Sequence, residues 1–246
     1  MTETTLSEWT DPSVMPAADA AALLADAPWT RMVTIGDSVA EGIREAVPGY
    51  RDMSWTDRVE EALGAVTPEF AALNLGRRDL VAAQVAAEQL RPALAFGPDL
   101  AFVVAGGNDM LRPHFDEDEV RRELASMVSA FRAAGADVVT IGLLDITAAG
   151  LGPPSSSPHP PPIKRRAPLG PSRFREVMSA RTRRLAALTA EVAAEHGACH
   201  VDNPPEHPVA ADPGIYSSDQ LHLNARGHAF AAANTIRALA AHLASA

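Results

Sequence analysis

The strongest constraint on the fold is a series of short apolar runs that alternate with segments of helical pattern. The apolar runs cover residues 32–35, 70–73, 100–104, 138–141 and 199–202. Helical patterns follow at 54–63, 80–94, 116–134, 172–195 and from Asn224 onward. Strands that alternate with helices in this way predict a parallel sheet covered on both faces. In such sheets the functional residues gather at the carboxyl ends of the strands.

Two segments lie outside this alternation. Residues 1–30 are polar and alanine-rich, with a short helix expected over 19–27, so we expect an N-terminal extension before a single domain at 31–246. Residues 152–171 are too rich in proline for a helix or a sheet strand. This loop leaves the carboxyl end of a strand. It is either disordered or a flap whose Lys164, Arg165 and Arg166 meet an anionic group of a substrate.

Charge and cysteine content narrow the functional classes. The 246 residues carry a formal charge of −10, which argues against a nucleic-acid partner. No apolar run of membrane-spanning length occurs, and the acidic, polar first residues do not resemble a secretion signal, so we expect a cytoplasmic protein. The single cysteine, Cys199, excludes an internal disulfide and a multi-cysteine zinc site. No phosphate-binding glycine loop is present, which disfavours nucleotide binding.

A serine follows the first apolar run at the expected strand-to-helix turn. Gly36 ends the run, Ser38 comes two residues later, and Gly42 closes the turn. A hydroxyl at that place lies beside helix N-terminal amides, which suits a nucleophile whose reaction develops negative charge. An ordinary N-cap serine is the structural alternative.

A candidate base lies near the C-terminus. Asp219 and His222 are three residues apart, just before the last helix. A carboxylate at that spacing can orient the imidazole and stabilise its protonated form. The alternative is a helix-start turn that contains a histidine by chance.

Three sequence blocks, in order, resemble those of the SGNH, or GDSL-type, hydrolases. The first is Gly-Asp-Ser-Val-Ala-Glu-Gly at 36–42, the second is Gly-Gly-Asn-Asp at 106–109, and the third is Asp-Gln-Leu-His at 219–222. The blocks span nearly the whole chain. The second glycine of the Gly-x-Ser-x-Gly turn of α/β-hydrolases is replaced by Ala40.

The resemblance implies a three-layer α/β/α sandwich with a five-stranded parallel sheet, flavodoxin-like, as in the SGNH hydrolase fold. It also implies Ser38 as nucleophile, His222 as general base, Asp219 as orienting acid, and an oxyanion hole built from the Ser38 amide and the Asn108 side chain. The implied reaction is hydrolysis of a small-molecule ester through an acyl-enzyme, without metal or cofactor. Two alternatives share the scaffold: an acyltransferase, and a catalytically weakened binding protein.

One position departs from the family pattern. The family places a glycine five residues after an asparagine, and its amide joins the oxyanion hole. Counted from Asn74, that position is Asp79, whose carboxylate would oppose a developing oxyanion. Gly76 is an alternative donor, and Arg77 or Arg78 could neutralise Asp79.

The remaining polar residues suggest structural roles. We expect Asp109 to brace its turn, and Asp145 and Asp202 either to line the pocket or to cap the ends of strands. The other histidines share no metal-ligand spacing and are expected on the surface or in the core: His114, His196, His200, His207, His228 and His242.

Overall fold

The computed structural model of the chain describes residues 6–150, 170–203 and 207–245. Most of the proline-rich loop at 152–171 lies outside these residues. No helix in the described part of the chain is both long and apolar enough to cross a membrane.

The centre of the molecule is a five-stranded sheet in which every neighbouring pair of strands is parallel. Its spatial order is β2-β1-β3-β4-β5. The strands are β1 (Arg31–Gly36), β2 (Ala71–Asn74), β3 (Leu100–Val104), β4 (Asp137–Ile141) and β5 (Cys199–Val201). This arrangement confirms the predicted parallel α/β/α sandwich. Continuous apolar runs mark the strands because the sheet is covered on both faces, and β3 is buried at every residue.

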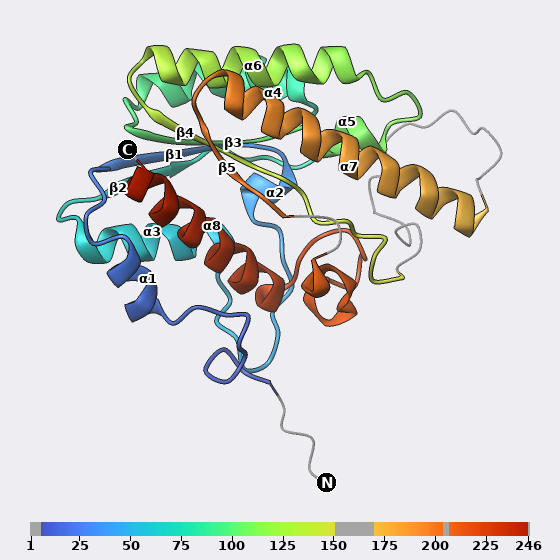
Figure 1. The fold of residues 1–246 in the computed structure, drawn as a ribbon, viewed down its shortest axis with the longest axis horizontal. Coiled ribbons are helices and arrows are strands. Elements are labelled where there is room, and N and C mark those ends of the chain that lie inside the picture. The colour runs from blue at the N-terminus through green and yellow to red at the C-terminus, as the bar shows by residue number, and fades with distance from the viewer. Residues whose placement is uncertain (1–5, 151–169, 204–206, 246) are drawn as a thin grey trace, which may run out of the picture.

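The helices cover the sheet in two layers (Figure 1). They are α1 (Ala17–Leu23), α2 (Ser38–Glu41), α3 (Trp55–Val66), α4 (Ala82–Ala95), α5 (Gly107–Leu111), α6 (Glu117–Ala133), α7 (Pro171–Glu195) and α8 (Ala225–Ser245), with 3₁₀ turns at Pro208–Ala211 and Pro213–Ile215. Helices α4, α6 and α7 pack on one face of the sheet, and α1, α3 and α8 pack on the other. Two apolar cores result, one on each side.

Most helix boundaries agree with the sequence patterns. Ser54 and Asp57 form the predicted capping box at the start of α3. The first helix differs, because it ends at Leu23 and the chain turns there instead of continuing to residue 27. Helix α2 begins at Ser38, where the sequence predicts a strand-to-helix turn, but its length and the helix α5 were not expected, since a single turn carries no periodicity of its own.

Residues 6–30 pack against the sandwich. Leu24 and Trp29 are fully buried in the core beneath α3 and α8. Farther toward the N-terminus, the buried Glu8 carboxylate accepts two hydrogen bonds from Arg58 of α3, at 2.7 and 2.9 Å. This segment therefore helps to hold the helices of one layer.

Candidate active site

The turn after β1 is fixed by close contact with β3. A Cβ atom on Gly36, whose φ is +150°, would lie 1.9 Å from the Val104 carbonyl oxygen, so only glycine fits there. Asp37 then caps α2, because its carboxylate accepts a hydrogen bond from the Val39 amide at 3.0 Å. Ser38 is thereby placed as the first residue of α2, at the carboxyl end of a central strand.

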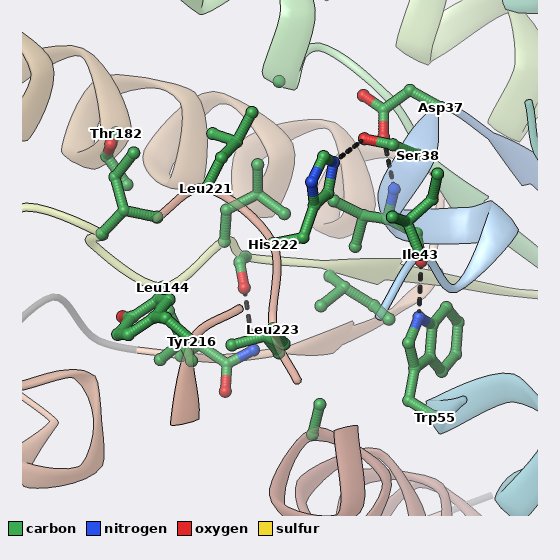
Figure 2. Close-up of a pocket in the computed structure, with 18 of the residues that line it drawn as sticks. Asp37, Ser38, Ile43, Trp55, Leu144, Thr182, Tyr216, Leu221, His222 and Leu223 are labelled. Carbon is green, nitrogen blue, oxygen red and sulfur yellow. Dashed lines mark hydrogen bonds between the residues drawn. The ribbon is translucent and has the colours of Figure 1, made fainter. Parts of the chain in front are cut away.

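Ser38 is the first member of a hydrogen-bonded chain. Its Oγ lies 2.8 Å from Nε2 of His222 (Figure 2). Nδ1 of that ring lies 2.6 Å from Oδ2 of Asp219. The Asp219 carboxylate also accepts the amides of Leu221 and His222, at 2.9 and 3.0 Å. Burial raises the pKa of Asp219, but the hydrogen bonds from the His222 ring and from these amides outweigh it and hold the pKa below its usual value. An ionised Asp219 keeps the proton on Nδ1, which leaves Nε2 as the acceptor facing the serine.

The histidine loop is tied to the turn that follows α2. Glu45 accepts hydrogen bonds from the amide and the hydroxyl of Ser218, and its own carbonyl accepts the Ala225 amide at 2.9 Å. Within the loop, Gln220 adopts a left-handed φ of 59°. These contacts join segments about 180 residues apart in sequence and set the position of the imidazole.

Asn108 and Asp109 brace the loops that follow β2 and β3. The Asn108 amide donates to the Leu80 carbonyl at 2.9 Å. The buried Asp109 carboxylate accepts the Ala82 amide at 2.9 Å, so it holds the start of α4, whereas the sequence suggested that it braces its own turn. An Asn amide has two hydrogens, so the bond to Leu80 leaves one for another acceptor.

Asp79 adopts a backbone conformation that usually favours glycine. Its φ of 68° lies in the left-handed region, which aspartate tolerates better than most residues. Its side chain is exposed, and its amide makes no hydrogen bond to the residues described here. The Gly76 amide, by contrast, donates to Oδ1 of Asn74 at 2.8 Å.

Neither neighbouring arginine pairs with Asp79. Arg77 forms an ion pair with Glu88, and Arg78 lies 3.8 Å from Glu41. The expectation that one of them neutralises Asp79 is therefore wrong in this structure, because closer carboxylates on α4 and α2 engage both.

A second carboxyl group lies directly beside the nucleophile. Asp37 is 2% exposed, and burial raises its pKa to about 7, with a further contribution from the charge of Asp109. The amides of Val39 and Gly107 act in the opposite direction. This group changes charge near neutral pH, which the sequence did not indicate because the shift depends on burial.

A cavity of about 110 Å³ opens beside Ser38 and His222. It extends under the loops that follow β3, β4 and β5, and most of its wall is apolar. Six of the apolar side chains are Met110, Leu111, Ile141, Leu143, Leu144 and Ile146. Sequence reasoning missed these residues, since a single apolar side chain in a loop carries no signal of a pocket.

The other candidate residues take structural roles. Asp145 accepts hydrogen bonds from Thr147 and Ser179, and Asp202 is exposed; neither lines the cavity. His228 lines the cavity, and burial lowers its pKa to about 4. Both of its ring nitrogens are already bonded to backbone groups. In the part of the chain covered by the structure, no three His, Cys, Asp or Glu side chains are grouped to hold a metal ion.

A parallel α/β/α sandwich with a serine, an oriented histidine and a carboxylate at the carboxyl ends of its strands defines a serine hydrolase. The model of the GDSL-like lipase/acylhydrolase family matches residues 34–230. The chain therefore belongs to that family and is a serine hydrolase that acts on ester bonds.

Solved structures share the fold at low sequence identity. An α/β hydrolase enzyme, LAE5, from the metagenome of Lake Arreo is 19% identical, with a TM-score of 0.61 over 85% of this chain and 94% of that chain. The acetylxylan esterase Axe2 from Geobacillus stearothermophilus is 20% identical, with a TM-score of 0.60 over the same shares. No curated protein sequence matches this chain significantly.

Proposed function

We propose that this chain hydrolyses a small-molecule carboxylic ester through an acyl-enzyme on Ser38. The observation that carries the proposal is the chain of hydrogen bonds from Ser38 Oγ through His222 to Asp219, at 2.8 and 2.6 Å. Each contact has the length required for proton transfer between nucleophile and base and for orientation of the base by a carboxylate.

The first half of the reaction forms the acyl-enzyme. Ser38 Oγ attacks the ester carbonyl carbon while His222 Nε2 takes the serine proton, and Asp219 stabilises the resulting imidazolium. The tetrahedral intermediate then collapses, and His222 returns the proton to the departing alcohol oxygen. In the second half, His222 deprotonates a water molecule that attacks the acyl carbon, and Ser38 leaves with its proton restored.

Three N–H donors are proposed for the oxyanion: the amides of Ser38 and Asp79 and the side chain of Asn108. The two amides have no hydrogen-bond partner among the described residues, and Asn108 keeps one amide hydrogen after its bond to Leu80. The engaged amide of Gly76 favours Asp79 over Gly76 as the third donor. Because an amide donates whatever its side chain, aspartate can fill the position that the family gives to glycine.

Turnover of p-nitrophenyl acetate and butyrate by the wild type and by Ser38→Ala tests the proposal. We expect Ser38→Ala to lower kcat by at least about 10³-fold, as nucleophile removal does in serine hydrolases. Ser129→Ala, at an exposed serine on α6, is the matched control and should retain full activity. Equal turnover by the wild type and Ser38→Ala would contradict the proposal and favour a binding protein on this scaffold.

A further inference from the structure

The shape and chemistry of the cavity beside Ser38 carry an inference about the substrate, which rests on the proposed ester hydrolysis. We infer that the cavity holds the acyl part of the ester, and that this part is an unsubstituted aliphatic chain of roughly five or six carbon atoms, the carbonyl carbon included.

The wall of the cavity offers a ligand almost no free polar group. The hydroxyls of Thr182, Thr235 and Tyr216 line it, but they donate to backbone carbonyls at 3.0, 2.9 and 3.0 Å. The Asn203 amide donates one of its two hydrogens to the Gly142 carbonyl at 2.8 Å, its oxygen accepts from Asn234 at 3.0 Å, and both ring nitrogens of His228 are bonded. Few groups in the wall remain for a ligand to bond, so a hydroxylated or charged group placed there would regain only part of its hydrogen bonds to water, whereas an alkyl chain loses none.

The volume of the cavity limits the length of the chain. Its volume is about 110 Å³. An apolar protein cavity of about 150 Å³ holds one benzene molecule, so this one holds roughly four or five carbons beyond the carbonyl region. An acetyl group would leave most of this space empty and most of its apolar wall without contact.

The position of the cavity in the sheet assigns it to the acyl group. Much of its wall follows β3, β4 and β5, and it extends from the nucleophile toward that side of the sheet, although Val39, Ile43 and Trp55 also line it. On the other side, Glu41, Arg44, Asp52 and Arg78 surround a shallow polar depression next to α2 and the turn after β2. The acyl group stays on the serine between the two half-reactions, which suits the more enclosed, apolar side. The alcohol must leave toward solvent, which suits the open, polar side.

Figure 2 shows Leu144 and Tyr216 on the side of the cavity away from Ser38. Leu144 is half-buried and lies in the loop after β4. Because its side chain limits the cavity opposite the nucleophile, it should set the acyl length that fits.

Two homologous series of esters test the inference. In the first, p-nitrophenyl esters from acetate to decanoate vary the acyl chain. In the second, alkyl acetates from methyl to hexyl vary the alcohol. In the acyl series we expect kcat/KM to rise about fourfold for each methylene from acetate to about hexanoate and then to stop rising. In the alcohol series kcat/KM should change much less with chain length. A maximum at acetate, or a chain-length preference confined to the alcohol series, would overturn the inference.

Variants at Leu144 make the test specific to the cavity. Leu144→Ala should move the optimum toward longer acyl chains, and Leu144→Phe should move it toward acetate. If Leu144→Phe fails to fold, Leu144→Ala still decides, and an unchanged profile in that variant would refute the inference. Leu23→Ala, at an exposed leucine on α1, is the matched control and should keep the wild-type profile.

Failure of this inference is distinguishable from failure of the proposed function. Turnover that depends on Ser38 but prefers acetate refutes only the aliphatic acyl chain. Turnover of every ester at the same rate by the wild type and Ser38→Ala refutes ester hydrolysis at Ser38 itself.

Discussion

Two roles are assigned to the side-chain amide of Asn108, one observed and one proposed. One hydrogen holds the Leu80 carbonyl, and the other is proposed to bind the oxyanion. We therefore expect Asn108→Ala to lower kcat by about 10²–10³-fold with little change in KM, because the lost interaction forms only in the transition state. Steady-state kinetics on p-nitrophenyl butyrate measure this.

The Asp79→Gly variant is the comparison for Asn108→Ala. It keeps the backbone amide and the left-handed backbone, so it should retain at least wild-type kcat. A loss in Asp79→Gly as large as that in Asn108→Ala would mean that the Asp79 side chain, and not its amide, takes part in the reaction.

The raised pKa of Asp37 predicts an unusual pH dependence of stability. Its native-state pKa of about 7 lies above the ordinary value of 3.8, so the folded protein binds more protons than the unfolded chain between these values. The contribution of Asp37 to the free energy of unfolding is therefore fully present below about pH 4 and is lost as the pH rises to about 7. In the Asp37→Asn variant the side chain stays neutral and can still accept the Val39 amide. The free energy of unfolding of this variant should therefore fall less than that of the wild type between about pH 4 and about pH 7.

Urea unfolding at pH 4, 5.5 and 7 measures the effect. The Asp26→Asn variant, at an exposed aspartate near α1, is the control and should follow the wild type. Parallel pH curves for the wild type and Asp37→Asn would show that Asp37 has no raised pKa in the folded protein.

The residues proposed for the chemistry carry a stronger sequence signal than their environment does. Ser38, Asn108, Asp219 and His222 occur in short local blocks, so the sequence points to them as candidates directly. The ionisation of Asp37 and the cavity depend on side chains that come from separate strands and loops. Such properties arise from burial, which no local pattern encodes.

The junction of β1 with α2 depends on one glycine. A side chain on Gly36 would overlap the Val104 carbonyl, so Gly36→Ala must separate β1 from β3 or displace the serine turn. We expect it to cost more than about 2 kcal/mol of unfolding free energy and most of the esterase activity. Urea unfolding together with ester turnover measures both.

The control for Gly36→Ala is the same substitution at a glycine in the middle of a helix. Gly64 of α3 is exposed, and nothing lies within 4 Å of the Cβ that alanine would add. Gly64→Ala should therefore stabilise the protein by about 0.5–1 kcal/mol. A Gly36→Ala variant as stable as the wild type would show that the junction tolerates a side chain.

The order of strands and long helices was predictable because each has a strong local pattern. Val138 to Ile141 and Leu100 to Val104 read as buried strands, and Ser54 with Asp57 marks a helix start. Helix α5 and the extent of α2 were not predictable, although the start of α2 at Ser38 was. Their residues are held by contacts with other loops, such as the hydrogen bond from Asn108 to the turn after β2.

Across the whole molecule, the N-terminal segment is held to the sandwich by a buried ion pair. The side chains of Glu8 and Arg58 are each 5% exposed. Glu8→Ala leaves the Arg58 charge buried without this partner, which should cost about 3–5 kcal/mol. Glu61→Ala is the control: its exposed pair with Arg51 should contribute at most about 1 kcal/mol.

The same pair predicts how the protein responds to acid. Burial raises the pKa of Glu8, but hydrogen bonds from Arg58 and Arg51 outweigh it and lower the pKa from 4.5 to about 2. The stabilisation is therefore present above about pH 4.5 and is lost as the pH falls toward 2, opposite in sign to that of Asp37. Thermal unfolding from pH 5 to pH 2 should show a shallower loss of Tm in Glu8→Ala than in the wild type. If Tm fell equally steeply with pH in the wild type and Glu8→Ala, Glu8 would not have a lowered pKa in the folded protein.

The central claim, that Ser38 is an activated nucleophile, is tested most directly by covalent labelling with a fluorophosphonate, followed by peptide mapping. We predict one modified residue, Ser38, with no labelling in Ser38→Ala and strongly slowed labelling in His222→Ala, because the histidine must take the serine proton. Labelling spread over several serines, or absent from Ser38 in the folded wild-type protein, would contradict it.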